Sequence, residues 1–241
     1  MIEKTRGIVL HQIKYTDSGT VVHLYTREFG RQSILIKGIR RKKAGKHNIM
    51  FQPMFILDLE IYFKASREMQ LLKEVTAFYT PYEIYSDIKK SSVAIFLSEV
   101  LSSVLKEENP QSEMFDFISE SIIYFDGARE NYANFHIAFL AALSSFLGFE
   151  PSQRKSRDDV FFDMKNGKFV PVPPVHGKYA NEETSEILSA FFKSSFDSVK
   201  NIILTGRKRN EVLETIVEFY SLHLPTLKRV NSLDILKEVF S

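Results

Sequence analysis

The sequence predicts an α+β fold, with a small closed β-barrel first and a helical domain with a β insertion after it. Five short segments with strand composition fill the first 80 residues. From Pro81 onward, apolar residues recur at the three-and-four spacing of helices, and an Asn-Gly turn between two short apolar runs interrupts them. We therefore expect a barrel domain over residues 1–80 and a helical domain over 81–241, with the insertion at about 149–180.

Strand composition and turn signals define the expected barrel. In the fourth segment, Leu57, Leu59 and Ile61 alternate with polar residues, which is typical of a half-buried strand. Gly30 lies in a short hairpin turn that requires positive φ. Five short strands favour closure, because an open sheet of this size would leave unpaired edges. The expected strands cover residues 5–15, 21–27, 31–39, 54–64 and 69–78.

The helical domain is predicted from apolar spacing and from signals at helix ends. Gly148 has the position of a glycine that follows a helix C-terminus, and Thr205 has the position of an N-cap. Asn166-Gly167, between two runs rich in Phe and Val, predicts a hairpin inside the insertion. The expected helices cover residues 93–105, 112–125, 132–147, 182–193, 207–222 and 233–240.

Composition excludes several classes of protein and of chemistry. The 241 residues are 44% hydrophobic, with 32 Lys and Arg against 30 Asp and Glu, a globular balance that excludes disorder, collagen and coiled coils. The chain has no cysteine, which excludes disulfides, a thiolate nucleophile and Cys-ligated zinc. It begins without the apolar run of a signal peptide, and its longest apolar stretch, Ile137–Leu143, is too short to span a membrane. We expect a cytoplasmic protein without a membrane segment.

Positive charge is concentrated in the first third of the chain. Residues 1–80 hold 14 Lys and Arg against 7 Asp and Glu, a net charge of +7, whereas residues 81–241 hold 18 against 23, a net charge of −5. The segment 37–47 alone contributes six cations and no carboxylate. Such a segment suits contact with the phosphates of a nucleic acid, although a solvated loop without a ligand has the same composition.

Aromatic side chains near these cations would add stacking on bases. Tyr15, Tyr25, Phe29 and Tyr62 are the candidates, and Tyr62 is the best placed because it shares the polar face of its strand with Lys64. The residues expected to contact DNA are Lys37, Arg40, Arg41, Lys42, Lys43, Lys46, Tyr62 and Lys64.

No catalytic constellation stands out in the sequence. The six histidines show no paired spacing for a metal, and no serine lies in a nucleophile elbow. In the helical domain, Arg207, Lys208 and Arg209 follow the expected N-cap, where cations oppose the helix dipole and a bound anion would relieve them. These three are candidates for binding an acidic partner peptide, although unpartnered surface cations have the same pattern.

Four short motifs follow one another in the first 80 residues: Arg6-Gly7-Ile8-Val9-Leu10, Thr26-Arg27-Glu28-Phe29-Gly30-Arg31, Lys37-Gly38-Ile39-Arg40-Arg41 and Phe51-Gln52-Pro53. Each motif is weak alone. Their joint order and spacing resemble those of the family of the bacterial DNA repair protein RecO. The helical part resembles the family in its layout rather than in its motifs.

The resemblance implies an OB-fold that binds single-stranded DNA, followed by a helical domain. It implies a non-catalytic recombination mediator without a cofactor, which anneals complementary strands and helps load RecA at gaps coated by single-strand binding protein. The implied partners are RecR, in some members RecF, and the acidic C-terminal tail of single-strand binding protein, which the helical domain binds. The family's DNA-binding role falls on the basic segment, and the sequence leaves open whether double-stranded DNA binds as well.

One departure from the family is plain, because many members carry a four-cysteine zinc module in the insertion and this chain has no cysteine. We therefore expect no metal there, and apolar packing by Phe161, Phe162 and Phe169 in its place. Two other functions stay open from the sequence. One is a protein-docking adaptor that does not bind DNA, and the other is a metal-dependent nuclease that uses Asp158, Asp159 and Asp163.

Overall fold

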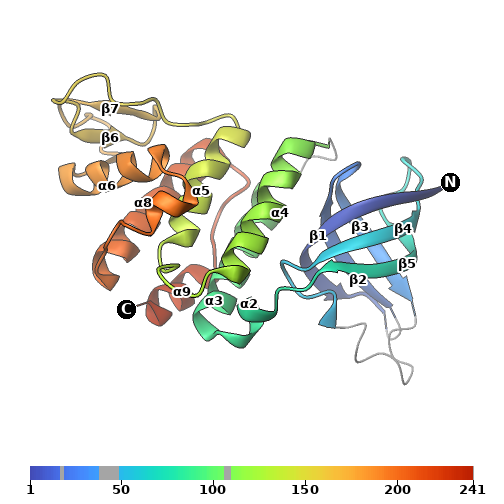
Figure 1. The fold of residues 1–241 in the computed structure, drawn as a ribbon. Helices are drawn as coiled ribbons and strands as arrows, with labels where there is room; N and C mark the ends of the chain where they lie inside the picture. The colour runs from blue at the N-terminus through green and yellow to red at the C-terminus, as the bar shows by residue number, and fades with distance from the viewer. Residues whose placement is uncertain (17–18, 38–48, 106–109, 241) are drawn as a thin grey trace. The chain divides into compact units, whose positions relative to one another are not determined.

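The computed structural model describes residues 1–16, 19–37, 49–105 and 110–240. The chain forms two compact units, Met1–Gly127 and Ala128–Ser241, which we call the barrel unit and the helical unit (Figure 1). The predicted boundary at residue 80 follows the change from strands to helices, whereas the compact units group residues 81–127 with the strands.

The barrel unit is built on a closed sheet of five strands in the order β1-β2-β3-β5-β4. Neighbouring strands are antiparallel except β3 and β5, which pair in parallel. The predicted α+β class and closed five-stranded barrel are confirmed, and the order is consistent with an OB-fold. The strands are β1 (Ile2–Lys14), β2 (Gly19–Thr26), β3 (Gly30–Lys37), β4 (Ile56–Tyr62) and β5 (Gln70–Tyr79).

Apolar side chains fill the inside of the barrel, and two glycines permit its tight geometry. A Cβ added at Gly7 would lie 3.0 Å from side-chain atoms of both Leu24 and Leu59, so β1 crosses the core closely at this residue. Gly30 has φ 61° in the hairpin between β2 and β3, as predicted. The buried core residues are Val9, Val22, Leu24, Ile34, Ile36, Phe51, Phe55, Leu57, Leu59 and Ile61.

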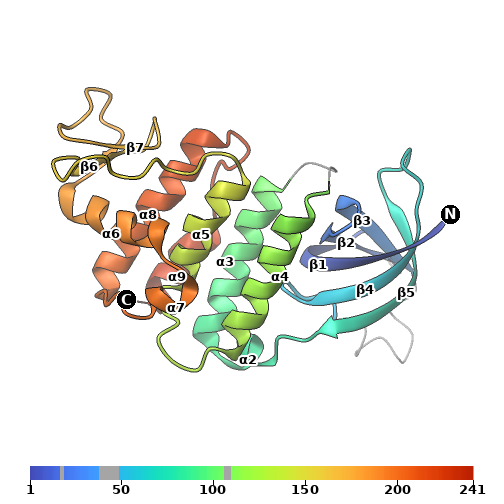
Figure 2. The ribbon, with the colours of Figure 1, turned by 45° about the horizontal axis from the view of Figure 1, so that its top comes forward.

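Helices α2 (Tyr82–Ser86), α3 (Ile88–Val104) and α4 (Ser112–Gly127) belong to the same unit. Figures 1 and 2 show α3 and α4 side by side, and α3 packs against β1. The side chain of Asp87 caps α3 by accepting hydrogen bonds from two backbone amides of its first turn. The sequence did not predict α2, because five residues are too few to show a helical period.

Asp126, near the end of α4, ties these helices to the sheet. Its buried carboxylate accepts hydrogen bonds from Tyr79 Oη and Ile84 N, each at 2.8 Å, and its backbone carbonyl oxygen accepts one from Lys90 Nζ at 2.8 Å. Burial, together with Asp126, raises the pKa of Tyr79 to about 12. One residue thus connects β5, α2, α3 and α4, which explains why the compact unit extends to Gly127.

The described part of the helical unit is organised around α5, which contacts α6, α7 and α8. Gly148 has φ 81° after α5, and Thr205 caps α8 by accepting a hydrogen bond from Lys208 N, as predicted. The sequence did not predict α7, which is only four residues long. The helices are α5 (Phe135–Phe146), α6 (Glu182–Lys193), α7 (Phe196–Val199), α8 (Gly206–His223) and α9 (Ser232–Val239).

The insertion forms a three-stranded sheet of β6 (Phe161–Asp163), β7 (Lys168–Val170) and β8 (Tyr179–Ala180), in the order β7-β6-β8. The predicted Asn-Gly hairpin is confirmed, with Gly167 at φ 59°. Phe162 and Phe169 are buried, and the Phe162 ring packs on Phe219 of α8 with centroids 5.2 Å apart. Among the described residues, none of the helices combines the length and hydrophobicity needed to cross a membrane.

Candidate nucleic-acid interface

The cations of the β2–β3 hairpin hold the barrel against its helices. Arg31 Nη1 donates hydrogen bonds to the carbonyl oxygens of Ser102 and Leu105, at the C-terminal end of α3. Arg27 forms a two-bond ion pair with Asp116 of α4, at 2.9 and 2.8 Å. Burial lowers the pKa of the Arg31 guanidinium, which is half-buried against the helix. This motif therefore acts in packing within the barrel unit.

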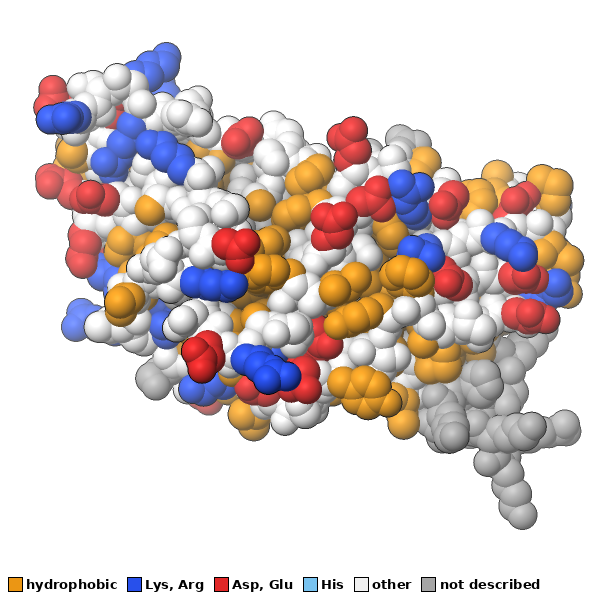
Figure 3. Space-filling view, in the orientation of Figure 1, with side chains coloured by type: hydrophobic (Ala, Val, Ile, Leu, Met, Phe, Trp, Pro, Cys, Tyr) orange, Lys and Arg blue, Asp and Glu red, His pale blue; other side chains and the backbone are white. Residues whose placement is uncertain are grey.

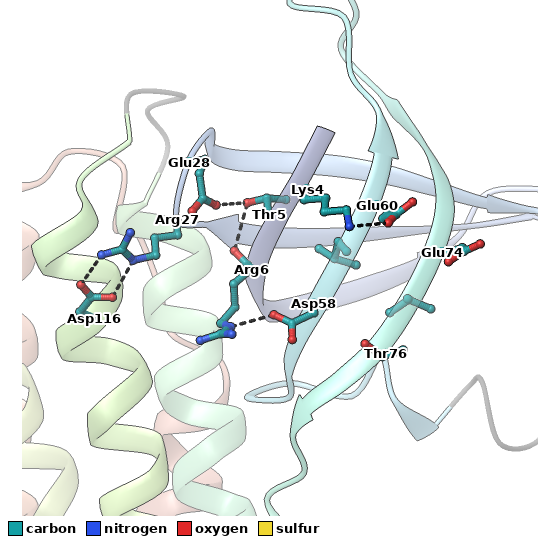
Figure 4. A pocket seen from close by; sticks show the side chains of 12 residues that line it. Lys4, Thr5, Arg6, Arg27, Glu28, Asp58, Glu60, Glu74, Thr76 and Asp116 are labelled. Atoms are coloured by element: carbon teal, nitrogen blue, oxygen red, sulfur yellow. Dashed lines mark hydrogen bonds and ion pairs between the residues drawn. The ribbon is translucent and has the colours of Figure 1, made fainter. Parts of the chain in front are cut away.

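A groove of about 860 Å³ lies beside β1, β4, β5 and the start of α4 (Figure 4). Its three cations are all paired within the unit: Lys4 with Glu60 at 3.2 Å, Arg6 with Asp58 at 2.8 Å, and Arg27 with Asp116. The carboxylates of the lining outnumber these cations, and they belong to Glu28, Asp58, Glu60, Glu74 and Asp116.

Mixed charge makes this groove a poor site for a phosphate chain. Figure 3 shows Lys and Arg side chains interspersed with Asp and Glu over this face of the barrel unit, rather than a field of one sign. A phosphate would have to displace a carboxylate from each cation that it contacts. A surface suited to a nucleic acid would therefore lie elsewhere on the barrel.

A row of apolar and aromatic side chains crosses the outside of β3, β5 and β4. Leu35 pairs with Leu71, and Leu71 pairs with Tyr62 in the strand register. The neighbours of Leu35 along β3 are core residues, so Leu35 faces outward, and Tyr62 is 43% exposed. Lys37, where the basic segment begins, is the last residue of β3 and lies two positions beyond Leu35.

The expected DNA contacts divide into those that the structure describes and those that it does not. Arg40, Arg41, Lys42, Lys43 and Lys46 lie outside the described residues.

Lys37 ends β3, Tyr62 ends β4, and Lys64 is exposed just after β4. Gln70 fixes the backbone there, since its side chain accepts a hydrogen bond from Lys64 N at 2.9 Å and donates one to Lys64 O at 3.2 Å. The register thus brings Tyr62 and the start of the basic segment to the same side of the barrel.

Two of the four aromatic candidates pack inside the protein instead of facing solvent. Tyr25 is 2% exposed, and Phe29 stacks on Phe63 with ring centroids 4.3 Å apart. Tyr15 is 53% exposed and stays available together with Tyr62. Sequence reasoning missed the outward residues Leu35 and Leu71. Apolar residues at the polar positions of β3 and β5 would have been the signal.

The expected partner-binding cations of α8 are largely engaged inside the helical unit. Lys208 pairs with Glu183 at 2.6 Å and with Glu211 at 2.8 Å. Arg209 donates from Nε to Asn134 Oδ1 at 2.9 Å and from Nη2 to the carbonyl oxygen of Leu204. Arg207 is exposed.

The aspartates considered for a nuclease serve the local structure of the insertion. Asp163 is 3% exposed and accepts hydrogen bonds from the backbone amides of Lys165 and Asn166, and His176 Nε2 lies 3.2 Å from its carboxylate. Although burial opposes it, this set of partners lowers the pKa of Asp163.

Asp159 accepts hydrogen bonds from the amides of Lys155 and Ser156. Within the described part of the chain, no group of three His, Asp or Glu side chains is arranged to hold a metal ion. The insertion has no cysteine, and two phenylalanines fill its core, so it does not fit the zinc of many RecO insertions.

The fold and this site define a two-part α+β protein that is built on a small β-barrel with a helical unit after it. A family model described as "Recombination protein O N terminal" matches residues 1–80, and one described as "Recombination protein O C terminal" matches residues 85–232. The chain belongs to the RecO family of DNA repair and recombination proteins.

Curated relatives match this chain along its whole length. The DNA repair protein RecO of Phocaeicola vulgatus is 34% identical over 241 residues, and that of Azobacteroides pseudotrichonymphae is 33% identical over 240 residues, with 100% of each chain covered. The DNA repair protein RecO of Flavobacterium psychrophilum is 30% identical over 239 residues, with 99% of each chain covered. The resemblance found in the sequence is thereby confirmed.

Proposed function

We propose that this protein binds single-stranded DNA through the outside of β3, β5 and β4, together with the basic segment that follows β3. The strand register carries the proposal, because it sets the exposed Tyr62 in one row with Leu35, two residues before that segment begins. Tyr62 would stack on a base, while Lys64 and the cations at 40–43 and 46 would neutralise phosphates.

The proposed role is that of a recombination mediator without catalytic activity. Neutralising the phosphates of two strands lowers their mutual repulsion, so the protein would anneal complementary strands. As proposed, it works with RecR and RecF, contacts the C-terminal tail of single-strand binding protein, and helps load RecA at gaps. Its relatives carry the name of a DNA repair protein, which supports a role in that machinery.

Fluorescence anisotropy of a labelled dT oligonucleotide at several salt concentrations tests the proposal. The variant R40A/R41A/K42A/K43A should bind more weakly, and its plot of log Kobs against log salt should be shallower by roughly 3, at ~0.7 per lost phosphate contact. The matched control is R129A/K193A/K228A/R229A, which removes the same charge from exposed positions of the helical unit. The control should keep the wild-type slope.

Equal affinity and slope in the wild type and the R40A/R41A/K42A/K43A variant would remove the basic segment from the mechanism. If the wild type also binds the oligonucleotide without salt dependence, the protein-docking adaptor becomes the better description. Annealing of two complementary labelled strands, followed by energy transfer, gives the second readout. It should slow in the same variant and not in the control.

A further inference from the structure

The sheet of the insertion carries a concentrated positive charge. Residues 151–180 contain six Lys and Arg and three Asp. In Figure 3, Lys and Arg side chains gather over β6 and β7. The part of the chain that departs from the family's cysteine pattern is therefore a cationic surface.

Two of the three aspartates that could pair with these cations accept hydrogen bonds from nearby backbone amides instead. Asp163 is buried under the hairpin turn, where two backbone amides and His176 contact it. Asp159 accepts hydrogen bonds from the amides of Lys155 and Ser156. Only Asp158 is left as an exposed carboxylate among the three. The carboxylates of Asp159 and Asp163 keep their charge, but among the described residues neither forms an ion pair with a Lys or Arg of the insertion.

Five cations of the insertion are exposed, and we call the four that lack an ion pair among the described residues the ribbon cations: Lys155, Arg157, Lys165 and Lys168. In the described chain, their side chains form no ion pair, whereas Lys178 in the same insertion pairs with Glu218 at 2.7 Å. The groove of the barrel unit shows the opposite pattern, since each of its cations has a carboxylate partner.

Two contacts bring the segment that carries Lys155 and Arg157 beside the hairpin that carries Lys165 and Lys168. Ser152 N donates a hydrogen bond to the carbonyl oxygen of Gly167 at 2.8 Å, so the segment that leads to Lys155 runs beside the hairpin turn. Arg154 lies over the ring of Phe169 in β7, with 5.0 Å from its guanidinium carbon to the ring centroid. The cations before β6 and those around the turn therefore flank the same strand.

Arg154 is the half-buried cation of the insertion. Its Nε and Nη2 atoms are buried and have no hydrogen-bond acceptor within the described residues. The Arg154 guanidinium therefore adds positive charge beside β7 without a carboxylate partner among the described residues.

We propose that the ribbon cations form a second nucleic-acid surface, which binds the sugar–phosphate backbone of a DNA strand. Three of the four are lysines, point charges on flexible stems that suit phosphates spread along a chain. Paired carboxylates of an acidic peptide would instead favour the planar forks of arginines. The inference goes beyond the proposed function, which places DNA on the barrel.

The test compares the full-length wild type with K155A/R157A/K165A/K168A, the barrel variant R40A/R41A/K42A/K43A, and the control R129A/K193A/K228A/R229A. Thermal melting by circular dichroism checks that the exposed changes leave the fold intact. In dT-oligonucleotide titrations, the ribbon variant should have a salt slope shallower by roughly 2 to 3. A second assay immobilises the protein on one saturating strand and measures capture of a second, non-complementary labelled strand. The ribbon variant should lose that capture, and the control should keep it.

The proposal is overturned if the ribbon variant matches the control in both slope and capture. It is also overturned if the ribbon variant loses affinity for polyglutamate while its DNA binding is unchanged, since the surface would then serve an acidic protein. A barrel variant with normal DNA binding beside a defective ribbon variant would refute the barrel site alone and support the ribbon surface.

Discussion

Replacing Arg31 by alanine should destabilise the barrel unit. The side chain makes two charge-assisted hydrogen bonds, to the carbonyl oxygens of Ser102 and Leu105, where α3 ends. Taken at the low end because the group is half-buried, two such bonds contribute about 3 kcal/mol, and the cation at a helix C-terminus adds about 0.5 kcal/mol. We expect the free energy of unfolding to fall by about 3 kcal/mol.

The matched control is Arg27→Ala, which removes the same charge from the same hairpin. Its ion pair with Asp116 is exposed to solvent and screened by salt, so its loss should matter less. Urea unfolding followed by circular dichroism gives the free energies, and hydrogen exchange shows whether α3 and β3 lose protection. An Arg31→Ala variant no less stable than Arg27→Ala would refute the idea that this family motif acts through packing.

Three other predictions concern single residues. Gly7→Ala should cost about 1–3 kcal/mol because its Cβ would lie 3.0 Å from Leu24 and Leu59 side-chain atoms, and an unchanged melting temperature would contradict this. Burial lowers the pKa of His136 from 6.5 to about 3. As pH falls below 6.5, the His136 ring therefore stays neutral in the folded chain, whereas in the unfolded chain it binds a proton. Stability should then drop by about 1.4 kcal/mol per pH unit. Urea unfolding at pH 7.5 and 5.0 should show a smaller drop in His136→Phe, and equal drops would contradict the assignment. Tyr62→Ala should weaken single-strand binding about tenfold in anisotropy titrations, since stacking contributes roughly 1–3 kcal/mol, whereas Tyr62→Phe should bind normally. Equal loss in both Tyr62 variants would argue against stacking.

The sequence predicted those features whose signals are local. The alternation in β4, the glycine of the β2–β3 turn, the Asn-Gly hairpin and the bounds of α6 all follow from neighbouring residues. Tyr25 shows what local signals cannot predict. Alternation distinguishes the two faces of a strand, but it does not show whether a helix covers the outer face. Phe115 of α4 lies against Tyr25, with ring centroids 6.3 Å apart, and that contact joins residues 90 positions apart.

The candidate site was predictable in part for the same reason. Tyr62 and Lys64 could be assigned to one face from their spacing alone. Their nearness to the end of β3 depends on the parallel pairing of β3 with β5, a long-range contact without a sequence signal. Arg27 and Arg31 were assigned to a motif, yet only coordinates show that both contact helices.

The buried carboxylate of Asp126 has a practical consequence for dissecting this protein. A fragment cut after residue 80 would lack three helices that contact the sheet, leaving Leu10 and Tyr25 uncovered and Tyr79 without its acceptor. Such a truncated piece should aggregate on expression, whereas a piece ending at Gly127 should be monomeric and resist limited proteolysis. The smallest independently foldable part of the chain would then be about half as long again as the strand region.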